Sequence, residues 1–284
     1  MKEFIQGSPE WKALRMNKIG ASDAAAIMGI SKWTTPYQLW EQKLGFREVE
    51  MNSAMQRGHD LEEEARQCFE RIYSILVFPD VVFHPEHEFL MASLDGIDIE
   101  RKVLVEIKNV NRHDHQSALD GKVPEHYYPQ CQHQLAVTGL PFMYYFSYDP
   151  LNPATVIVPR DDSYIADMIE KEKEFYRYMT EFEAPLLTDR DYVEHNDSQW
   201  EIYADDFLAA QKIRKEWEDK ENYYRKRLIE LAQEKNSKGH GIRLTRFIRR
   251  GNIQYDKIAE LQGVDLEPYR KPPIESWRIC ETDE

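Results

Sequence analysis

Apolar residues recur with two different periods along this chain, and the change of period marks out its elements. Across residues 53–74 they fall three or four apart, at Leu61, Ala65, Phe69 and Ile72, which predicts a helix with one buried face. Ser, Thr, Pro and Gly mark the ends of such elements. Helices are predicted over residues 8–15, 22–29, 34–45, 53–74, 124–139, 163–182 and 205–234. Strands are predicted over residues 75–90, 91–110 (as a hairpin), 142–148, 154–158, 242–248 and 253–255. Residues 109–121 and 184–200 are expected to be irregular.

The stretch 91–110 predicts a β-hairpin, because two apolar runs flank a polar turn at 100–102. Pairing about this turn sets residues opposite one another when their numbers sum to about 201 or 202, so Asp95 faces Glu106. Side chains alternate along a strand, so Lys108 shares the face of Glu106. One face of the hairpin therefore presents two carboxylates and an ammonium group.

Glu106 ends the apolar run Val103-Leu104-Val105, which is typical of the tip of a buried central strand. A charge there is costly unless it is functional. Two close carboxylates repel unless a cation lies between them, and oxygen ligands favour Mg²⁺ or Mn²⁺. Lys108 could hold or deprotonate a water at such a metal. The alternative is the solvated face of an ordinary antiparallel hairpin.

Two further features carry candidate chemistry. Ser22 at a predicted helix start, with Arg15 one loop away, is a possible phosphate site; the alternative is an ordinary N-cap with an unrelated arginine. In the helix over 124–139, Gln130 and Gln134 are four residues apart and share a face, whereas Gln132 points elsewhere.

The order of elements predicts an α/β fold, a mixed central sheet flanked by helices, in place of a doubly wound sheet. There is no glycine-rich phosphate loop, zinc signature or Gly-x-Ser-x-Gly elbow. We expect a core over residues 1–183, an acidic linker over 184–204, and a helix-plus-hairpin extension over 205–284 packed on the core.

Composition places the chain among soluble globular proteins. It has 284 residues, of which 42% are hydrophobic and 12% aromatic, enough for a large core. No 18-residue apolar run and no basic-then-apolar leader is present, so no membrane partner and a cytoplasmic location are expected. Cys68, Cys131 and Cys280 leave one thiol unpaired in any disulfide scheme, which suits a reducing compartment.

The net charge of −14 argues at first against a nucleic-acid partner. The basic residues are unevenly spread, however: residues 211–250 hold 13 basic against 6 acidic side chains, and residues 160–206 hold 5 against 15. A locally basic surface can bind DNA despite the total charge. Arg225, Lys226, Arg227 and the segment 243–250 are candidates for such a surface, or for a merely solvated basic face.

Taken together, the motifs resemble those of the lambda exonuclease/YqaJ viral recombinase family, a branch of the PD-(D/E)xK nucleases. The matching motifs are Arg15 with Ile19-Gly20-Ala21-Ser22, Gly58-His59-Asp60-Leu61-Glu62 with Ala65, Ser93-Leu94-Asp95-Gly96, Glu106-Ile107-Lys108, and Gln130-Cys131-Gln132. The likeness covers about residues 8–160, with a vaguer one over 249–257. Leu94 stands where a proline often precedes the aspartate, a position that shapes the backbone and binds no metal.

The resemblance implies the site residues and their roles. The implied catalytic set is Asp95, Glu106, Lys108, Glu62 and Gln132; the implied metal ligands are Asp95, Glu106, Glu62 and the Ile107 carbonyl; and the implied 5′-phosphate or DNA contacts are Arg15, Ser22, Ser93, Gln130 and Met55. Lys108 would orient or activate the attacking water, supported by Gln132 or, as second choice, Gln130. Met55 would be an apolar wedge that splits the end base pair.

The same resemblance implies a PD-(D/E)xK core and a Mg²⁺-dependent 5′→3′ exonuclease. The enzyme would bind two Mg²⁺ ions, for which Mn²⁺ could substitute. It would digest one strand of linear double-stranded DNA to mononucleotides, starting from 5′-phosphorylated ends. The product would carry 3′ overhangs for phage or prophage recombination in the bacterial host cytoplasm, together with a single-strand annealing protein. Family members form homotrimer rings, and a basic lining would reconcile the acidic total charge with DNA binding.

Three alternatives stand beside this interpretation. A structure- or sequence-specific endonuclease could use the same core, and cleavage of closed circles would favour it. A DNA end-binding protein with a dead nuclease site would be expected to have lost one of Asp95, Glu106 and Lys108. A Ca²⁺-binding structural protein would need a loop of closely spaced oxygen ligands, which the sequence lacks.

Overall fold

The computed structural model of the chain describes residues 8–48, 53–109 and 111–249 with residues 251, 258 and 264, and leaves out the side chains of 53–55 and 57–59. Two compact units are present, Met1–Glu194 and His195–Glu284. In the described ranges, no helix combines the length and apolar character that crossing a membrane requires.

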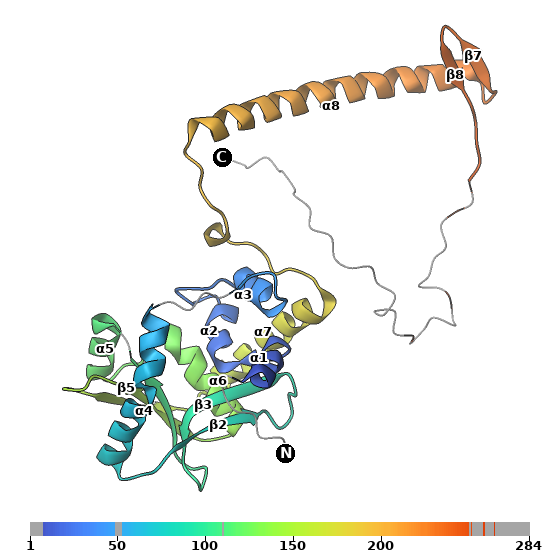
Figure 1. Cartoon of the computed structure of the whole chain (residues 1–284). Coiled ribbons are helices and arrows are strands. Elements are labelled where there is room, and N and C mark those ends of the chain that lie inside the picture. The colour runs from blue at the N-terminus through green and yellow to red at the C-terminus, as the bar shows by residue number, and fades with distance from the viewer. Residues whose placement is uncertain are drawn as a thin grey trace. The chain divides into compact units, whose positions relative to one another are not determined.

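A six-stranded mixed sheet forms the centre of the first unit (Figure 1). Its strands are β1 (Ile19–Gly20), β2 (Phe78–Phe83), β3 (Leu90–Ile97), β4 (Leu104–Lys108), β5 (Phe142–Ser147) and β6 (Ala154–Pro159). The order is β1-β3-β4-β5-β6, with β2 also paired to β3. Strand β4 runs antiparallel to β3 and parallel to β5, so it is a central strand, as its continuous apolar run predicts.

Helices cover both faces of this sheet. They are α1 (Pro9–Met16), α2 (Ala24–Ile27), α3 (Pro36–Lys43), α4 (Ser53–Tyr73), α5 (Arg112–Leu119), α6 (Tyr128–Thr138) and α7 (Asp162–Glu181). One hydrophobic cluster joins α2, α3, α6 and α7 to a face that includes Leu104. A second joins α4, through Ala65 and Phe69, to Val105 and Ile107. Because Leu104 and Val105 point to opposite faces, the predicted α/β fold with a mixed sheet flanked by helices is confirmed.

Local signals explain most helix ends in this unit. The Ser8 hydroxyl accepts the Trp11 N–H at 3.2 Å and begins α1, where Pro9 takes the first position. Thr35 and Gln38 form a reciprocal capping box at α3. The helix predicted over 22–29 is instead a 3₁₀ turn, Ala21–Asp23, followed by the short α2.

One segment of the first unit was predicted wrongly as a loop. Residues 109–121 contain α5, whose start is fixed by Asn111. Its side-chain carbonyl accepts the N–H groups of His113 and Asp114 at 2.9 and 3.1 Å. The cap is polar and the helix buries little besides Asp114 and Ala118, so hydrophobic spacing gave no sign of it.

The second unit begins with α8 (Ser198–Ala232), capped by the Asp197 carboxylate. This helix starts seven residues before the predicted position 205, so the predicted linker 184–204 includes its first two turns. A hairpin that the sequence did not predict is present, in which β8 (Ile242–Leu244) pairs with β7 (Ser237–Gly239). The predicted strand 253–255 lies outside the described residues. His240 and Gly241 both have positive φ, the geometry of a two-residue hairpin turn.

Candidate active site

Strands β3 and β4 meet in the predicted register, with Gly96 opposite Val105 and Ile97 opposite Leu104. The next residues along are Asp95 and Glu106. There the backbone ladder ends, and the Asp95 carboxylate takes over: its Oδ2 accepts the Ile107 N–H at 2.8 Å. The two acids therefore lie where β3 and β4 part.

A β-bulge in β3 sets the position of Asp95. The register of β2 against β3 shifts by one between the pairs Phe78/Ile97 and Asp80/Leu94. Two residues of β3, Asp95 and Gly96, thus lie opposite a single residue of β2. Bulges of this kind re-aim a side chain, and they are common beside active sites.

Glu106 is 1% exposed and is surrounded by donors. The side-chain amides of Gln130 and Gln134, one turn apart on α6, donate to its two oxygens, Oε1 and Oε2. Lys108 Nζ lies 2.7 Å from Oε1. A buried carboxylate is costly without hydrogen-bond partners, and α6 and β4 together supply them.

Glu106 raises the pKa of both Asp95 and Lys108, which favours the neutral form of the aspartate and the charged form of the lysine. Burial, together with the neighbouring Glu106 carboxylate, raises the pKa of Asp95 well above its usual range. Burial alone would lower the pKa of Lys108, but the charges of Glu106 and Asp95 outweigh it and raise that pKa. The ring of Tyr127 also lies 5.1 Å from Lys108 Nζ, in cation–π geometry. Tyr127 was not singled out by the sequence.

Helix α4 brings Glu62 to the same region. Arg66 Nη1 lies 3.8 Å from Glu62 Oε1 and donates to the Asp95 carbonyl at 3.2 Å. The Glu62 charge adds to the rise in the pKa of Asp95. Asp95, Glu106, Lys108 and Glu62 are thus gathered from two strands and one helix.

The donor chemistry of this site fits a hard divalent cation, although its acids do not converge fully. In the described part of the chain, no group of three or more His, Cys, Asp or Glu side chains forms a metal-type cluster. Asp95 and Glu106 nevertheless stand on adjacent strands, close enough that one raises the pKa of the other. Such a pair favours a cation between its members.

The position of Gln132 does not agree with its predicted supporting role. Its amide donates to the Pro159 carbonyl at 2.9 Å and its oxygen accepts the Asp161 N–H at 3.0 Å. It thus ties α6 to the start of α7, on the other side of the helix from Glu106. Gln134, which the implied catalytic set lacks, takes that place, and the four-residue spacing of Gln130 and Gln134 was the available signal.

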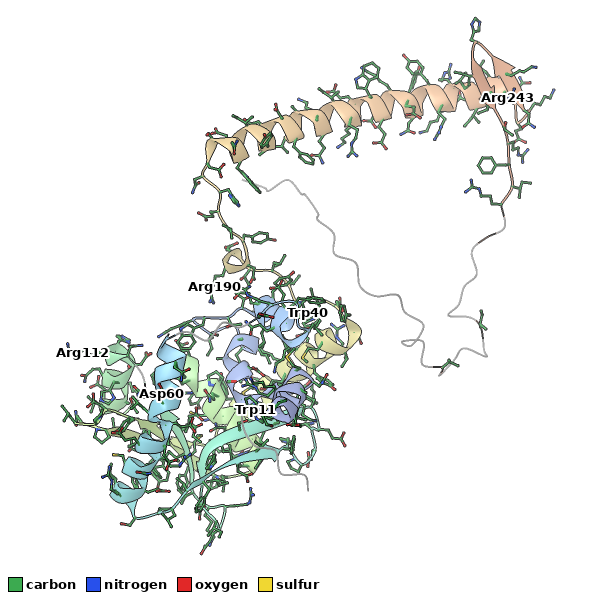
Figure 2. All side chains as sticks on the ribbon, in the orientation of Figure 1. Trp11, Trp40, Asp60, Arg112, Arg190 and Arg243 are labelled. Atoms are coloured by element: carbon green, nitrogen blue, oxygen red, sulfur yellow. The ribbon has the colours of Figure 1, made fainter. Side chains whose placement is uncertain are left out.

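The candidate phosphate-binding residues lie near one another around α1. Arg15 Nη2 donates to the Ser22 hydroxyl at 2.6 Å, and the Arg15 guanidinium lies over the Trp11 ring at 5.0 Å. The Trp11 indole N–H in turn donates to the Ser93 hydroxyl at 3.0 Å; Figure 2 labels Trp11. The side chain of Met55 is outside the described residues.

A buried ion pair that the sequence did not reveal anchors this group. Lys43 on α3 and Asp23 are both almost fully buried and 2.5 Å apart. Lys43 also donates to the carbonyls of Arg15 and Lys18 at 2.9 and 2.8 Å. Burial opposes ionisation of Asp23, but Lys43 and Arg15 lower its pKa. The sequence analysis did not single out Lys43.

Comparison with known proteins places the chain in a family. The model of the YqaJ-like viral recombinase domain matches residues 10–141. An uncharacterized protein, YqaJ of Bacillus subtilis (strain 168), is 34% identical over 134 residues, which cover 46% of this chain and 42% of that protein. The match thus spans less than half of the curated relative.

Solved structures agree with this assignment. An alkaline exonuclease from Laribacter hongkongensis, LHK-Exo, is 30% identical with a TM-score of 0.54, and the alignment covers 62% of this chain and 94% of that one. A structure of LHK-Exo with dAMP matches over the same shares at 28% identity and a TM-score of 0.54. By sequence and by fold, this chain belongs to the YqaJ-like viral recombinase family.

Proposed function

We propose that this chain is a Mg²⁺-dependent deoxyribonuclease that digests one strand of linear duplex DNA from its 5′ end to mononucleotides. The observation that carries the proposal is the grouping of Asp95, Glu106 and Lys108 where β3 and β4 part. Family membership and the likeness to an alkaline exonuclease support it. The LHK-Exo complex with dAMP, a nucleoside monophosphate, agrees with mononucleotide products.

Asp95 and Glu106, with the Ile107 carbonyl, would hold the metal, and Glu62 would serve a second ion or its water. A divalent cation supplies Lewis-acid stabilisation of the charge that builds up on a phosphodiester during hydrolysis. Gln130 and Gln134 of α6 keep the Glu106 carboxylate in a fixed orientation. Fixed ligands reduce the reorganisation that the reaction would otherwise require.

Lys108 acts as a hydrogen-bond donor in this proposal. Its ammonium group is paired with Glu106 at 2.7 Å and is held over Tyr127. From this position Nζ can orient the attacking water and stabilise negative charge on the scissile phosphate. Of the two roles considered for Lys108, orientation of the water fits this pairing better than removal of a proton.

The direction of digestion would follow from the residues around α1. Ser93 precedes Asp95 by two residues on β3, a separation of about 7 Å along a strand. Arg15 and Ser22 adjoin Ser93 through Trp11. A terminal 5′-phosphate bound by these three side chains would place the first phosphodiester near Asp95. Because a terminal phosphate exists only at a DNA end, digestion would start there.

The remaining parts of the proposal rest on the family resemblance. They are a homotrimer ring, a single-strand annealing partner, 3′ overhangs that serve phage or prophage recombination, and a location in the bacterial cytoplasm. Each stays a prediction.

The test compares wild type, Lys108→Ala and Lys102→Ala on end-labelled linear duplex, with and without 5′-phosphate, and on a closed circle, all with Mg²⁺. Lys102 is an exposed lysine of the same hairpin and serves as the matched control. We expect loss of the 5′-phosphorylated linear duplex with wild type and Lys102→Ala, and loss of activity with Lys108→Ala.

Two outcomes would overturn the proposal. Cleavage of the closed circle would indicate an endonuclease. Binding of DNA without any cleavage by wild type would indicate an end-binding protein with an inactive site.

A further inference from the structure

Helix α8 carries large apolar side chains that stay exposed in the described part of the chain. Of its 35 residues only Ala232 is buried, and side chains project from the helix along its whole length (Figure 2). Trp217, Tyr224 and Leu231 are 64%, 62% and 80% exposed. A long helix owes most of its stability to packing of an apolar face. We therefore expect another segment or molecule to pack against the apolar face of α8.

The apolar residues of α8 follow a heptad repeat. The a positions are Trp200, Phe207, Arg214, Glu221 and Leu228, and the d positions are Tyr203, Ala210, Trp217, Tyr224 and Leu231. Eight of these ten positions are apolar, against eight of the other 25 in the helix. Alternating spacings of three and four over five heptads are the pattern of a coiled-coil seam. We call these ten positions the α8 seam.

The side chains of the α8 seam leave open space between them. A hollow opens on the seam, lined by Arg214, Trp217, Glu218, Lys220, Glu221 and Tyr224. These residues occupy the a, d, e and g positions, which form the holes of a coiled coil. Lys220 Nζ lies 4.6 Å from the Trp217 ring and leaves its other face available.

The two charged seam residues argue against a parallel pairing with a second copy. In a parallel, in-register pair, Arg214 would meet Arg214 and Glu221 would meet Glu221. Lys220 would also flank Arg225 across the interface. Like charges in these positions are destabilising, so a parallel pair or a parallel trimer is disfavoured.

An antiparallel pairing removes each of these conflicts. With the two helices fully overlapped, a positions meet d positions: Arg214 lies beside Trp217 of the second copy, where a cation–π contact can form. Glu221 lies opposite Ala210 and keeps Arg225 of its own helix at 4.0 Å. At the flanking g positions, Asp206 of one copy lies beside Arg227 of the second copy. The acidic N-terminal part of each helix thus faces the basic C-terminal part of the other.

We propose that α8 is a self-association surface, and that two copies of this chain pair through their α8 seams in antiparallel orientation. The pairing has two-fold symmetry, so the assembly contains an even number of chains: two if the first unit does not assemble, and six if it forms the predicted homotrimer ring. It does not rest on the proposed nuclease function, because none of the candidate catalytic, metal-binding or 5′-phosphate-binding residues belongs to α8. The basic residues Arg225, Lys226 and Arg227, which the sequence offered as a candidate DNA-binding surface, do lie on α8.

The first experiment measures the mass of the full chain in solution, by light scattering or sedimentation, with two variants at adjacent tyrosines. Tyr224 lies on the seam and Tyr223 does not, although their exposures are 62% and 59%. We expect Tyr224→Glu to halve the mass at micromolar concentration and Tyr223→Glu to leave it unchanged. Far-ultraviolet circular dichroism and cooperative unfolding of both variants would show that the first unit stays folded.

A charge exchange tests the orientation. Asp206→Lys and Arg227→Glu should each raise the dissociation constant of the pair by about tenfold, because the two-fold axis doubles each flanking contact. The double variant Asp206→Lys/Arg227→Glu should return to within about twofold of wild type. In a parallel pair these residues would lie about 30 Å apart, and no rescue would occur.

Several outcomes would overturn the proposal. A wild-type mass of one chain, or of any odd number of chains, would mean that something else covers the seam, such as another part of the same chain or a different protein. An unchanged mass in Tyr224→Glu would exclude the seam from the interface. Failure of the charge exchange to restore the pairing would exclude the antiparallel register.

Discussion

Glu106 is a buried carboxylate whose oxygens are fixed by one ammonium and two amides. The amides come from adjacent turns of one helix, so their donors act as a pair. Register arithmetic on the hairpin was sufficient to bring Asp95, Glu106 and Lys108 together. It could not choose among three glutamines of α6, because the rotation of α6 about its axis depends on tertiary packing.

The glutamines can be separated by alanine substitution. We expect Gln134→Ala to lower kcat/KM on linear duplex about 10- to 100-fold, the usual effect of removing a residue that orients a metal ligand. Gln132→Ala should lower Tm, because it loses contacts to Pro159 and Asp161, while the folded protein keeps its activity. The reverse result would restore the role that the resemblance implied for Gln132.

Gly96 shows why the residue after Asp95 has no side chain. A Cβ at this position would lie 2.7 Å from Val77 Cγ2 and 2.8 Å from Val105 Cγ1. We expect Gly96→Ala to destabilise the fold by about 1–3 kcal/mol through overpacking, as measured by chemical denaturation. Adding Val77→Ala should recover part of the loss; if it does not, the strain lies in the backbone of the bulge and not in these contacts.

At the scale of elements, α6 is fixed by a buried histidine. His133 Nδ1 lies 2.7 Å from Glu172 Oε1 on α7, and His133 Nε2 lies 2.9 Å from the Met91 carbonyl on β3. A carbonyl and a carboxylate are both acceptors, so this pair of contacts fits an imidazole ring that carries a proton on each nitrogen. Burial opposes this charge, but Glu172 outweighs it and raises the pKa of His133. The imidazolium thus holds α6 between β3 and α7.

This contact predicts a pH-dependent stability. A group whose pKa is higher in the folded than in the unfolded state contributes its full stabilisation below the unfolded pKa, about 6.5 for histidine. That contribution is lost as pH rises through the folded pKa. The free-energy difference between wild type and Glu172→Gln should therefore be largest near pH 6 and should shrink at alkaline pH. Chemical denaturation from pH 6 to 9 measures it, and a constant difference would contradict the charged pair.

Elements were predictable where apolar spacing and end signals agreed, as in α1, α3, α4 and α6. The misplaced elements had other causes. The start of α5 depends on one polar cap, Asn111. The turn between β7 and β8 depends on the positive φ angles of two residues, His240 and Gly241. Neither leaves a hydrophobic period. The β3 bulge at Asp95 depends on pairing with β2, which is a tertiary property.

At the scale of the whole molecule, the charge of −14 is distributed between two different units. The first carries the sheet and the candidate active site, and the second carries α8 with its hairpin. The core was predicted to end at residue 183, but residues after 183 contact the segment that precedes α3. Arg190, labelled in Figure 2, donates to the carbonyls of Ser31 and Lys32 at 2.8 and 3.0 Å. Asp191 accepts a hydrogen bond from Thr35.

These contacts predict that a fragment ending at Glu194 is more stable than one ending at Glu183. Each hydrogen bond contributes about 1 kcal/mol, so loss of the three should lower Tm by about 5–10 °C in a domain of this size. Arg190→Ala in the longer fragment should reproduce part of the decrease, because it removes two of the bonds and leaves the Thr35–Asp191 contact. Equal Tm values for the two fragments would place the end of the folded core at residue 183, as the composition of the acidic segment first indicated.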